Sequence, residues 1–169
     1  MNIITTTNLT IQPLNLSYTP FILELTNTEG WLRFIGNRNI NTIDDAHNYI
    51  TKIINTPSIA YYVVTLNSSK EPIGLLTVIK RAYLPNPDFG VAFLPQYNTK
   101  GYAYEASKAL LPKLIASHVT LVAITLADNL KSIALLQKIN FRFEKTIEIE
   151  NEQLQLYTLN SVHPVLFLK

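Results

Sequence analysis

The stretch that decides the fold is Pro95–Ala106, which reads PQYNTKGYAYEA. It follows an apolar run typical of a strand, Phe89–Leu94, and leads into a helix-forming segment. A short loop between a strand end and a helix start presents backbone N–H groups that have no partner in the helix. Such a helix start favours anions, phosphates above all. Gly101 lets the backbone approach a ligand, Ala103 keeps the next turn slim, and Lys100 can add a positive charge. The stretch therefore predicts a pyrophosphate cradle.

Outward from this stretch, apolar periodicity and turn residues predict a mixed order of elements. Before it we expect a strand, a helical region and a hairpin, at Thr10–Leu14, Pro20–Gly30, and Ala60–Leu66 with Ile73–Ile79. A second helix is expected to begin at Thr42, where Asp45 has the spacing of a capping box. After the cradle we expect a helix, a buried strand, a helix from Asp128-Asn129, and a closing hairpin. The first helix is expected at Tyr104–His118, the buried strand at Val119–Leu126, and the hairpin at Phe141–Ile149 with Gln153–Leu159. Pro112 predicts a kink or an early break near Lys108–Pro112, because proline removes a backbone hydrogen bond.

Composition limits what the protein can be. The chain has 169 residues, 47% of them hydrophobic, and a net charge of +2. We expect one domain over residues 1–169, with its core at about 9–159. No secretory signal and no apolar run near the length of a membrane span is visible, so we expect a cytoplasmic protein without a membrane partner. The small net charge argues against a nucleic-acid partner. The absence of cysteine excludes disulfides and a thiol nucleophile, and the dispersed histidines indicate no metal site.

Two segments resemble the GNAT acetyltransferase superfamily. They are the cradle, Asn98–Ala103, and the run Asn129–Phe141, NLKSIALLQKINF. Within that superfamily, Gly101–Ala106 and Trp31–Gly36 are most similar to the branch that contains the ribosomal-protein alanine N-acetyltransferases. The similarity extends from about Leu9 to Leu159. It implies a single α/β domain with a mixed, mostly antiparallel sheet, a splayed central strand pair and helices on both faces. It also implies acetyl-CoA as the co-substrate.

The resemblance further implies which residues bind acetyl-CoA. The pyrophosphate would lie on the cradle, formed by Asn98, Thr99, Lys100, Gly101, Tyr102 and Ala103. Backbone groups of Phe93 and Leu94 would hold the pantetheine arm and polarise the thioester carbonyl, and Asn129 would contact the pantetheine or position its helix. The family cradle usually reads Gln/Arg-x-x-Gly-x-Gly/Ala. Asn98 therefore departs from Gln or Arg, and Thr99 stands where many members have Gly. Because backbone N–H groups bind the phosphates, we expect these departures to weaken the site without abolishing it.

Catalytic groups are less evident. Leu136 occupies the position at which many members carry a tyrosine acid. Protonation of the leaving thiolate would then come from Ser132 or water, or be unnecessary, since a thiol with a pKa of about 8.5 is a tolerable leaving group. The candidates for a general base are Asp88, Glu105, Glu148, Glu150 and Glu152. We take Asp88 and Ser132 as the catalytic candidates.

The sequence therefore predicts an acetyl-CoA-dependent N-acetyltransferase. The acceptor would be a primary amine of a peptide, a protein or a small molecule, and it would attack acetyl-CoA directly in a ternary complex. A catalytically weak or inactive acyl-CoA-binding module is the alternative, and an α/β interaction domain that does not bind CoA is a third. We expect a monomer or a homodimer. The acceptor pocket falls in Phe21–Ile54 and the late hairpin, where no motif identifies the acceptor.

Overall fold

A single sheet of eight strands organises the computed structural model, which describes residues 3–117 and 120–160. The strands are β1 (Ile4–Thr5), β2 (Leu9–Pro13), β3 (Ile59–Leu66), β4 (Pro72–Ile79), β5 (Asp88–Phe93), β6 (Thr120–Leu126), β7 (Arg142–Ile149) and β8 (Glu152–Asn160). Their order in the sheet is β1-β2-β3-β4-β5-β6-β8-β7.

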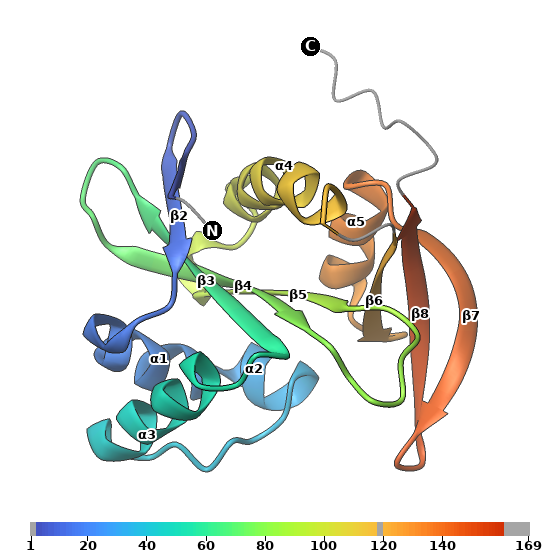
Figure 1. Cartoon of the computed structure of the whole chain (residues 1–169), viewed down its shortest axis with the longest axis horizontal. Helices are drawn as coiled ribbons and strands as arrows, with labels where there is room; N and C mark the ends of the chain where they lie inside the picture. Colours follow the sequence, from blue (N-terminus) through green and yellow to red (C-terminus); the bar gives the residue numbers. More distant parts are fainter. Residues whose placement is uncertain (1–2, 118–119, 161–169) are drawn as a thin grey trace.

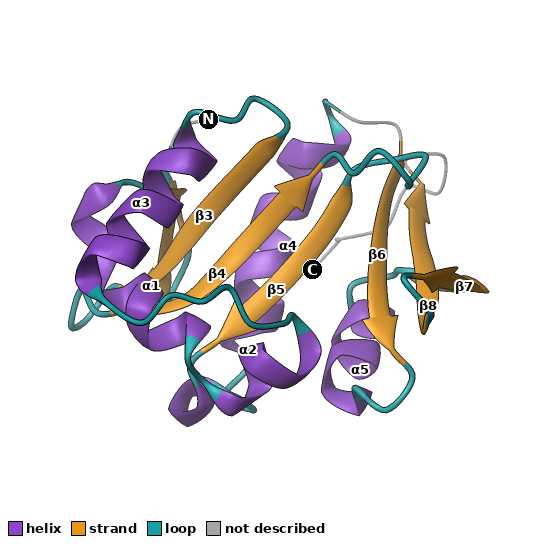
Figure 2. Ribbon diagram, turned by 90° about the horizontal axis from the view of Figure 1, so that it is seen from below, coloured by secondary structure: helices purple, strands orange, loops and turns teal. Residues whose placement is uncertain are grey.

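The two central strands, β5 and β6, are splayed. Every other neighbouring pair is antiparallel, whereas β5 and β6 run parallel and meet only where Asp88 pairs with Val122. Beyond that pair the strands diverge toward their carboxyl ends (Figure 2). The expected mixed, mostly antiparallel sheet with a splayed central pair is thus confirmed.

Helices cover both faces of the sheet (Figure 1). On one face lie α1 (Thr19–Thr26), α2 (Glu29–Phe34) and α3 (Ile43–Ile54), and on the other lie α4 (Tyr102–Ile115) and α5 (Leu130–Lys138). Each face has its own apolar core, because side chains alternate between the faces along a strand. Val63 and Leu75 pack with the α1–α3 helices, whereas Tyr62 and Leu76 pack with α4 and α5.

Side chains cap two helix starts, and the first of them confirms the predicted capping box. The Thr42 hydroxyl accepts a hydrogen bond from Asp45 N–H at 3.1 Å, and the Asp45 carboxylate accepts one from Thr42 N–H at 2.9 Å, which is the capping box of α3. The Asn129 side chain caps α5 by accepting from Ser132 N–H at 3.2 Å. Thr42 and Asn129 thereby satisfy donors that the first helical turn cannot pair.

Two expectations are corrected, and one strand was not predicted. The region Pro20–Gly30 forms two helices, because α1 ends at Thr26 and the Thr28 hydroxyl caps α2. The early break near Pro112 is wrong, since α4 continues to Ile115; its buried leucines, among them Leu111, outweigh one lost hydrogen bond. Strand β1 was not predicted, because two residues carry no periodicity.

The expected element ends at His118 and Val119 lie outside the described residues. Within residues 3–117 and 120–160, no helix is both long and apolar enough to cross a membrane.

Candidate functional site

The start of α4 lies directly after the end of β5, separated from it by the short helical turn Pro95–Tyr97. Gly101 is the residue before the helix and has a φ of +84°, and Glu105 N–H donates the first helical bond to Gly101 C=O at 3.0 Å. No side chain in the described part of the chain caps this end. The N–H groups of the first turn therefore have no partner inside the helix, and they can bind an anion.

The loop before this helix start is held in an uncommon conformation. Thr99 has a φ of +69°, which a β-branched residue rarely adopts. The GNAT resemblance implies glycine at this position in many members, and the backbone here has a glycine-like turn that the threonine side chain opposes. The exposed Lys100 places its Nζ 5.2 Å from the centre of the Tyr97 ring.

A pocket of about 490 Å³ adjoins the helix start, between α4 and the N-terminal segment, and its lining includes Lys100, Gly101 and Glu105. The Glu105 carboxylate accepts hydrogen bonds from the Thr6 hydroxyl at 2.6 Å and from the Asn8 backbone and side chain at 2.9 and 3.0 Å. Partial burial alone would raise the pKa of Glu105, but the bonds from Thr6 and Asn8 outweigh it and lower that pKa. Glu105 therefore links α4 to the first strands, a role that its place in the first turn did not indicate.

The open edge of β5 presents backbone groups of alternate residues. Leu94 N–H donates to Ile73 C=O of β4 at 3.0 Å. Because consecutive strand residues direct their N–H and C=O groups to opposite sides, those of Phe93 point toward the diverging β6. The Phe93 ring is fixed over Gly74, where an added Cβ would lie 2.5 Å from the ring. Phe93 thus has backbone groups directed into the gap, whereas Leu94 N–H is already paired.

On the α1–α3 face, one row of residues crosses three strands: Tyr61 of β3 is opposite Thr77 of β4, which is opposite Gly90 of β5. A Cβ on Gly90 would lie 2.5 Å from Thr77 Oγ1, so the row leaves no room for a side chain there. The Tyr61 hydroxyl lies 3.2 Å from that of Tyr49 on α3. Burial and the neighbouring Tyr49 raise the pKa of Tyr61, so its hydroxyl stays protonated.

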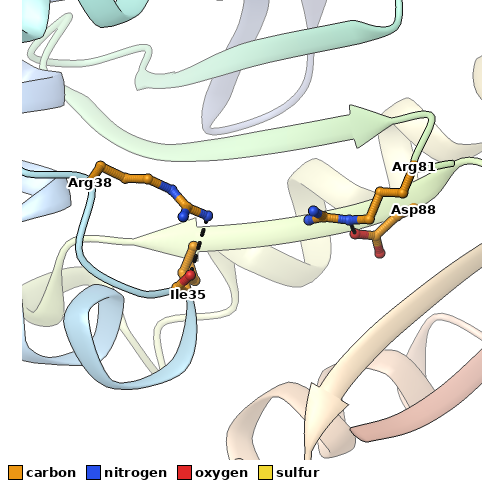
Figure 3. A network of polar contacts seen from close by, with 4 residues as sticks. All are labelled: Ile35, Arg38, Arg81 and Asp88. Atoms are coloured by element: carbon orange, nitrogen blue, oxygen red, sulfur yellow. Dashed lines mark hydrogen bonds and ion pairs between the residues drawn. The ribbon is translucent and has the colours of Figure 1, made fainter. Parts of the chain in front are cut away.

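Asp88 lies two residues before Gly90 and so on the same face. Its side chain is only 7% exposed, and its Oδ2 lies 2.7 Å from Arg81 Nε, as Figure 3 shows. Burial raises the pKa of Asp88, and the ion pair with Arg81 opposes that rise. Asp88 is also the point where β5 and β6 part, at the opposite end of β5 from the cradle.

The remaining predicted residues lie on or before α5. Ser132 is half-buried in the first turn, and its N–H is held by Asn129. Leu136 is buried in the core beneath α4 and α5, so no hydroxyl is available from that position. Just before the helix, Asp128 pairs with Arg33 of α2 at 2.8 Å, and both side chains are more than half exposed. The structure thus brings the cradle to one end of β5, while Asp88 and Ser132 come from different elements, β5 and α5.

Sequence comparison gives one match to a domain family. The acetyltransferase (GNAT) domain matches residues 8–142. No curated protein matches the chain.

Solved structures share the fold. A GNAT-family acetyltransferase from Bacillus anthracis is 22% identical with a TM-score of 0.80, and the match covers 96% of this chain and 100% of that one. The ribosomal-protein-S5-alanine acetyltransferase from Vibrio fischeri is 15% identical with a TM-score of 0.81, covering 95% and 97%. The spermidine N-acetyltransferase from Vibrio cholerae, solved with CoA and spermine, is 19% identical with a TM-score of 0.79, covering 93% and 98%. At these identities the likeness is one of fold.

Proposed function

Since the chain belongs to the GNAT acetyltransferases, we propose that it transfers an acetyl group from acetyl-CoA to a primary amine. The observation that carries the proposal is the uncapped start of α4, which follows Gly101 at the open end of the splayed strands. Unpaired N–H groups and the helix dipole together stabilise a pyrophosphate there. Two of the similar structures also bear names of amine acetyltransferases, one for spermidine and one for a protein alanine.

The residues present fit acetyl-CoA as the donor. We assign the pyrophosphate to the backbone of Asn98–Ala103 and to Lys100, and the rest of the nucleotide to the adjoining pocket of about 490 Å³. The Phe93 backbone groups are directed at the gap between β5 and β6, where an extended arm could pair with them as a further strand would. Leu94 contributes through its buried side chain, because its N–H is already bound to Ile73. Asn129 would order the far side of the gap by capping α5.

Catalysis would rest mainly on positioning of the two substrates. Acetyl-CoA supplies an acetyl group on a thioester; the amine nitrogen attacks the carbonyl carbon, and the carbon–sulfur bond breaks. We assign Asp88 as the acceptor of the amine proton, since burial raises its pKa and makes the carboxylate a stronger base. We assign Ser132 as the hydroxyl that passes a proton to the leaving thiolate and takes one in turn from a solvent water, so that it stays neutral. With no cysteine in the chain, no acyl-cysteine intermediate is involved.

A second candidate function is an acyl-CoA-binding module with weak or no transferase activity. Two observations favour it: Leu136 is an apolar core residue where a hydroxyl would serve as the acid, and Asp88 is engaged by Arg81. The two candidates share the donor site and differ only in turnover.

The two candidates are separated by measuring binding and turnover independently. Acetyl-CoA is expected to raise the melting temperature in both cases. Thiol release on addition of amino acids, N-terminal peptides or polyamines is expected only for the transferase. Binding without release from any acceptor supports the module, and absence of binding contradicts both. Ping-pong kinetics with an isolable acyl-enzyme would contradict direct attack.

A further inference from the structure

Two arginine side chains extend over the α1–α3 face of the sheet from different segments. Arg38 follows α2, and its Nη2 donates to Ile35 C=O at 3.2 Å. Arg81 follows β4, and its Nε donates to Asp88 Oδ2 at 2.7 Å. Figure 3 shows the guanidinium ends of Arg38 and Arg81 pointing toward each other. Both also favour ionisation of the Tyr61 hydroxyl, which places them around the same part of the face.

Arg38, Arg81 and Asp88 form a cluster with an excess of positive charge. Asp88 neutralises Arg81, whereas Arg38 contacts a neutral carbonyl and is exposed to solvent. The need to neutralise the buried Asp88 carboxylate explains the placement of Arg81 only. It does not account for a second guanidinium directed at the first, since like charges repel. An anion between them would remove that repulsion.

The positive surface continues beyond the two arginines. A pocket of about 300 Å³ lies beside Arg81, and it is lined by Lys80, Arg81 and the residues Leu84, Pro85, Asn86 and Pro87. No carboxylate is among these lining residues. Lys80 therefore adds a further positive charge in the pocket beside Arg81.

The cluster adjoins the place where transfer would occur. Asp88 and Gly90 share its face, and the open edge of the same strand faces the gap assigned to acetyl-CoA. Gly90 is opposite Thr77, whose hydroxyl oxygen would lie 2.5 Å from an added Cβ. In the same row, the protonated Tyr61 hydroxyl contacts that of Tyr49. A guanidinium presents paired N–H groups that match the two oxygens of a carboxylate. A substrate carboxylate held between Arg38 and Arg81 would thus lie beside the amine that reacts.

On this geometry, and resting on the proposed function, we propose that the acceptor is an amine that also carries a carboxylate, which binds between Arg38 and Arg81. The carboxylate belongs either to a free amino acid or to an acidic side chain close to a peptide N-terminus. A polyamine would bring further positive charge to this cluster and is a poor acceptor.

Matched acceptors test the proposal. Initial rates of thiol release are compared for glycine against glycinamide, for peptides beginning Ala-Glu against Ala-Gln, and for spermidine. The carboxylate member of at least one pair is expected to have a kcat/KM about tenfold higher or more, since a charge-assisted pair contributes at least that much. The pair that responds identifies the source of the carboxylate.

Variants locate the effect on the protein. Arg38→Gln is expected to remove the preference by raising KM for the carboxylate member, and Arg38→Lys to restore the preference in part. The control is Arg142→Gln, which removes one positive charge from an exposed residue at the start of β7 and should retain the full preference. Arg38 is exposed, so its loss should leave the fold intact.

The outcomes separate this inference from the proposed function. Turnover with equal or better rates for neutral or cationic amines, or a preference that survives Arg38→Gln, overturns the carboxylate site and leaves the transferase standing. If no amine turns over, calorimetry with the acetyl-CoA-bound protein decides instead. Binding of the carboxylate member that weakens about tenfold in Arg38→Gln supports the site, and equal binding of both members overturns it.

Discussion

The sides of the splayed strands proposed to bind donor and acceptor are built in different ways. At the carboxyl end of β5, the donor side uses backbone groups of consecutive residues, with Gly101 and the first turn of α4 as its main parts. At the other end, the acceptor side uses side chains from separate segments: Arg38 after α2, Tyr61 on β3, and Arg81 with Asp88 around β5. Binding by the backbone tolerates changes of side chain, whereas binding by side chains does not.

If the two proposals hold, the donor side should tolerate changes of side chain that the acceptor side would not. Asn98 and Thr99 depart from the usual cradle, yet the helix start remains uncapped and Gly101 keeps its positive φ. A single substitution at Arg38 or Arg81 would alter the charge of the acceptor face. We expect substitutions on the donor side to change affinity for acetyl-CoA, and substitutions on the acceptor side to change stability or acceptor choice.

The largest effect is expected from Asp88→Ala. This change leaves the Arg81 guanidinium, 28% exposed, without its carboxylate. Breaking a buried ion pair by removing one partner costs about 3 kcal/mol, so the free energy of unfolding in urea should fall by that order. The double variant Asp88→Asn with Arg81→Gln should lose less than the two single variants together. Strict additivity would contradict the coupling between the two residues.

Gly101→Ala should have the next largest effect. Alanine at a φ of +84° costs about 1–2 kcal/mol, even though its Cβ would contact nothing within 4 Å. The loop should therefore rearrange and acetyl-CoA should bind more weakly by calorimetry, while acceptor preference is retained. Gly30→Ala is the control, because Gly30 lies inside α2 and its added Cβ also meets nothing within 4 Å. Equal loss of affinity in both variants would show that Gly101 has no special role.

Thr99→Gly should act in the opposite direction. Glycine relieves the positive φ of +69°, and its greater freedom in the unfolded chain offsets part of the gain. A net increase of about 0.5–1 kcal/mol in the free energy of unfolding is expected from the difference of those two effects. Thr99→Ala keeps the strained conformation and should gain less. If both variants are equally stable, the backbone at this position does not carry the strain.

The smallest effect concerns Glu105 and pH. Its pKa is lowered in the folded protein, so its contribution is complete above the unfolded pKa near 4.3 and is lost as the pH falls through the folded value. Unfolding of the protein and of Glu105→Gln, measured from pH 6 to pH 3, should differ most at the upper end and converge toward the lower end. A difference that grows on acidification would contradict the assigned direction.

The sequence predicted the parts of the fold that local chemistry decides. The Thr42 capping box, the Asn129 cap and the strand–helix junction at Gly101 each depend on residues a few positions apart, and the capping box and the cap are confirmed by direct contacts. The two-residue strand β1 was missed for want of periodicity. The early break near Pro112 was wrong because burial of the α4 leucines keeps the helix intact to Ile115.

The contacts of the acceptor face could not be predicted in the same way. Asp88 was singled out as a base candidate, but its ion pair with Arg81 depends on the turn between β4 and β5. The approach of Arg38 depends on how α2 and the segment after it cross the sheet. No periodicity or spacing in one sequence specifies such pairings, because they arise only once the helices are packed. The hydrogen bonds of Glu105 to Thr6 and Asn8, 99 and 97 residues away, escaped for the same reason.

Those hydrogen bonds have a consequence for any shortened form of the protein. Glu105 is an anion in the first turn of the helix that is proposed to receive the pyrophosphate, and Thr6 and Asn8 now occupy its oxygens. A chain trimmed to begin at Leu9 would retain every cradle residue but would leave that carboxylate free to compete for the helix start and to repel the phosphates. Its weaker binding of acetyl-CoA should recover as added salt screens the repulsion, which would identify the segment with Thr6 and Asn8 as a shield for the donor site.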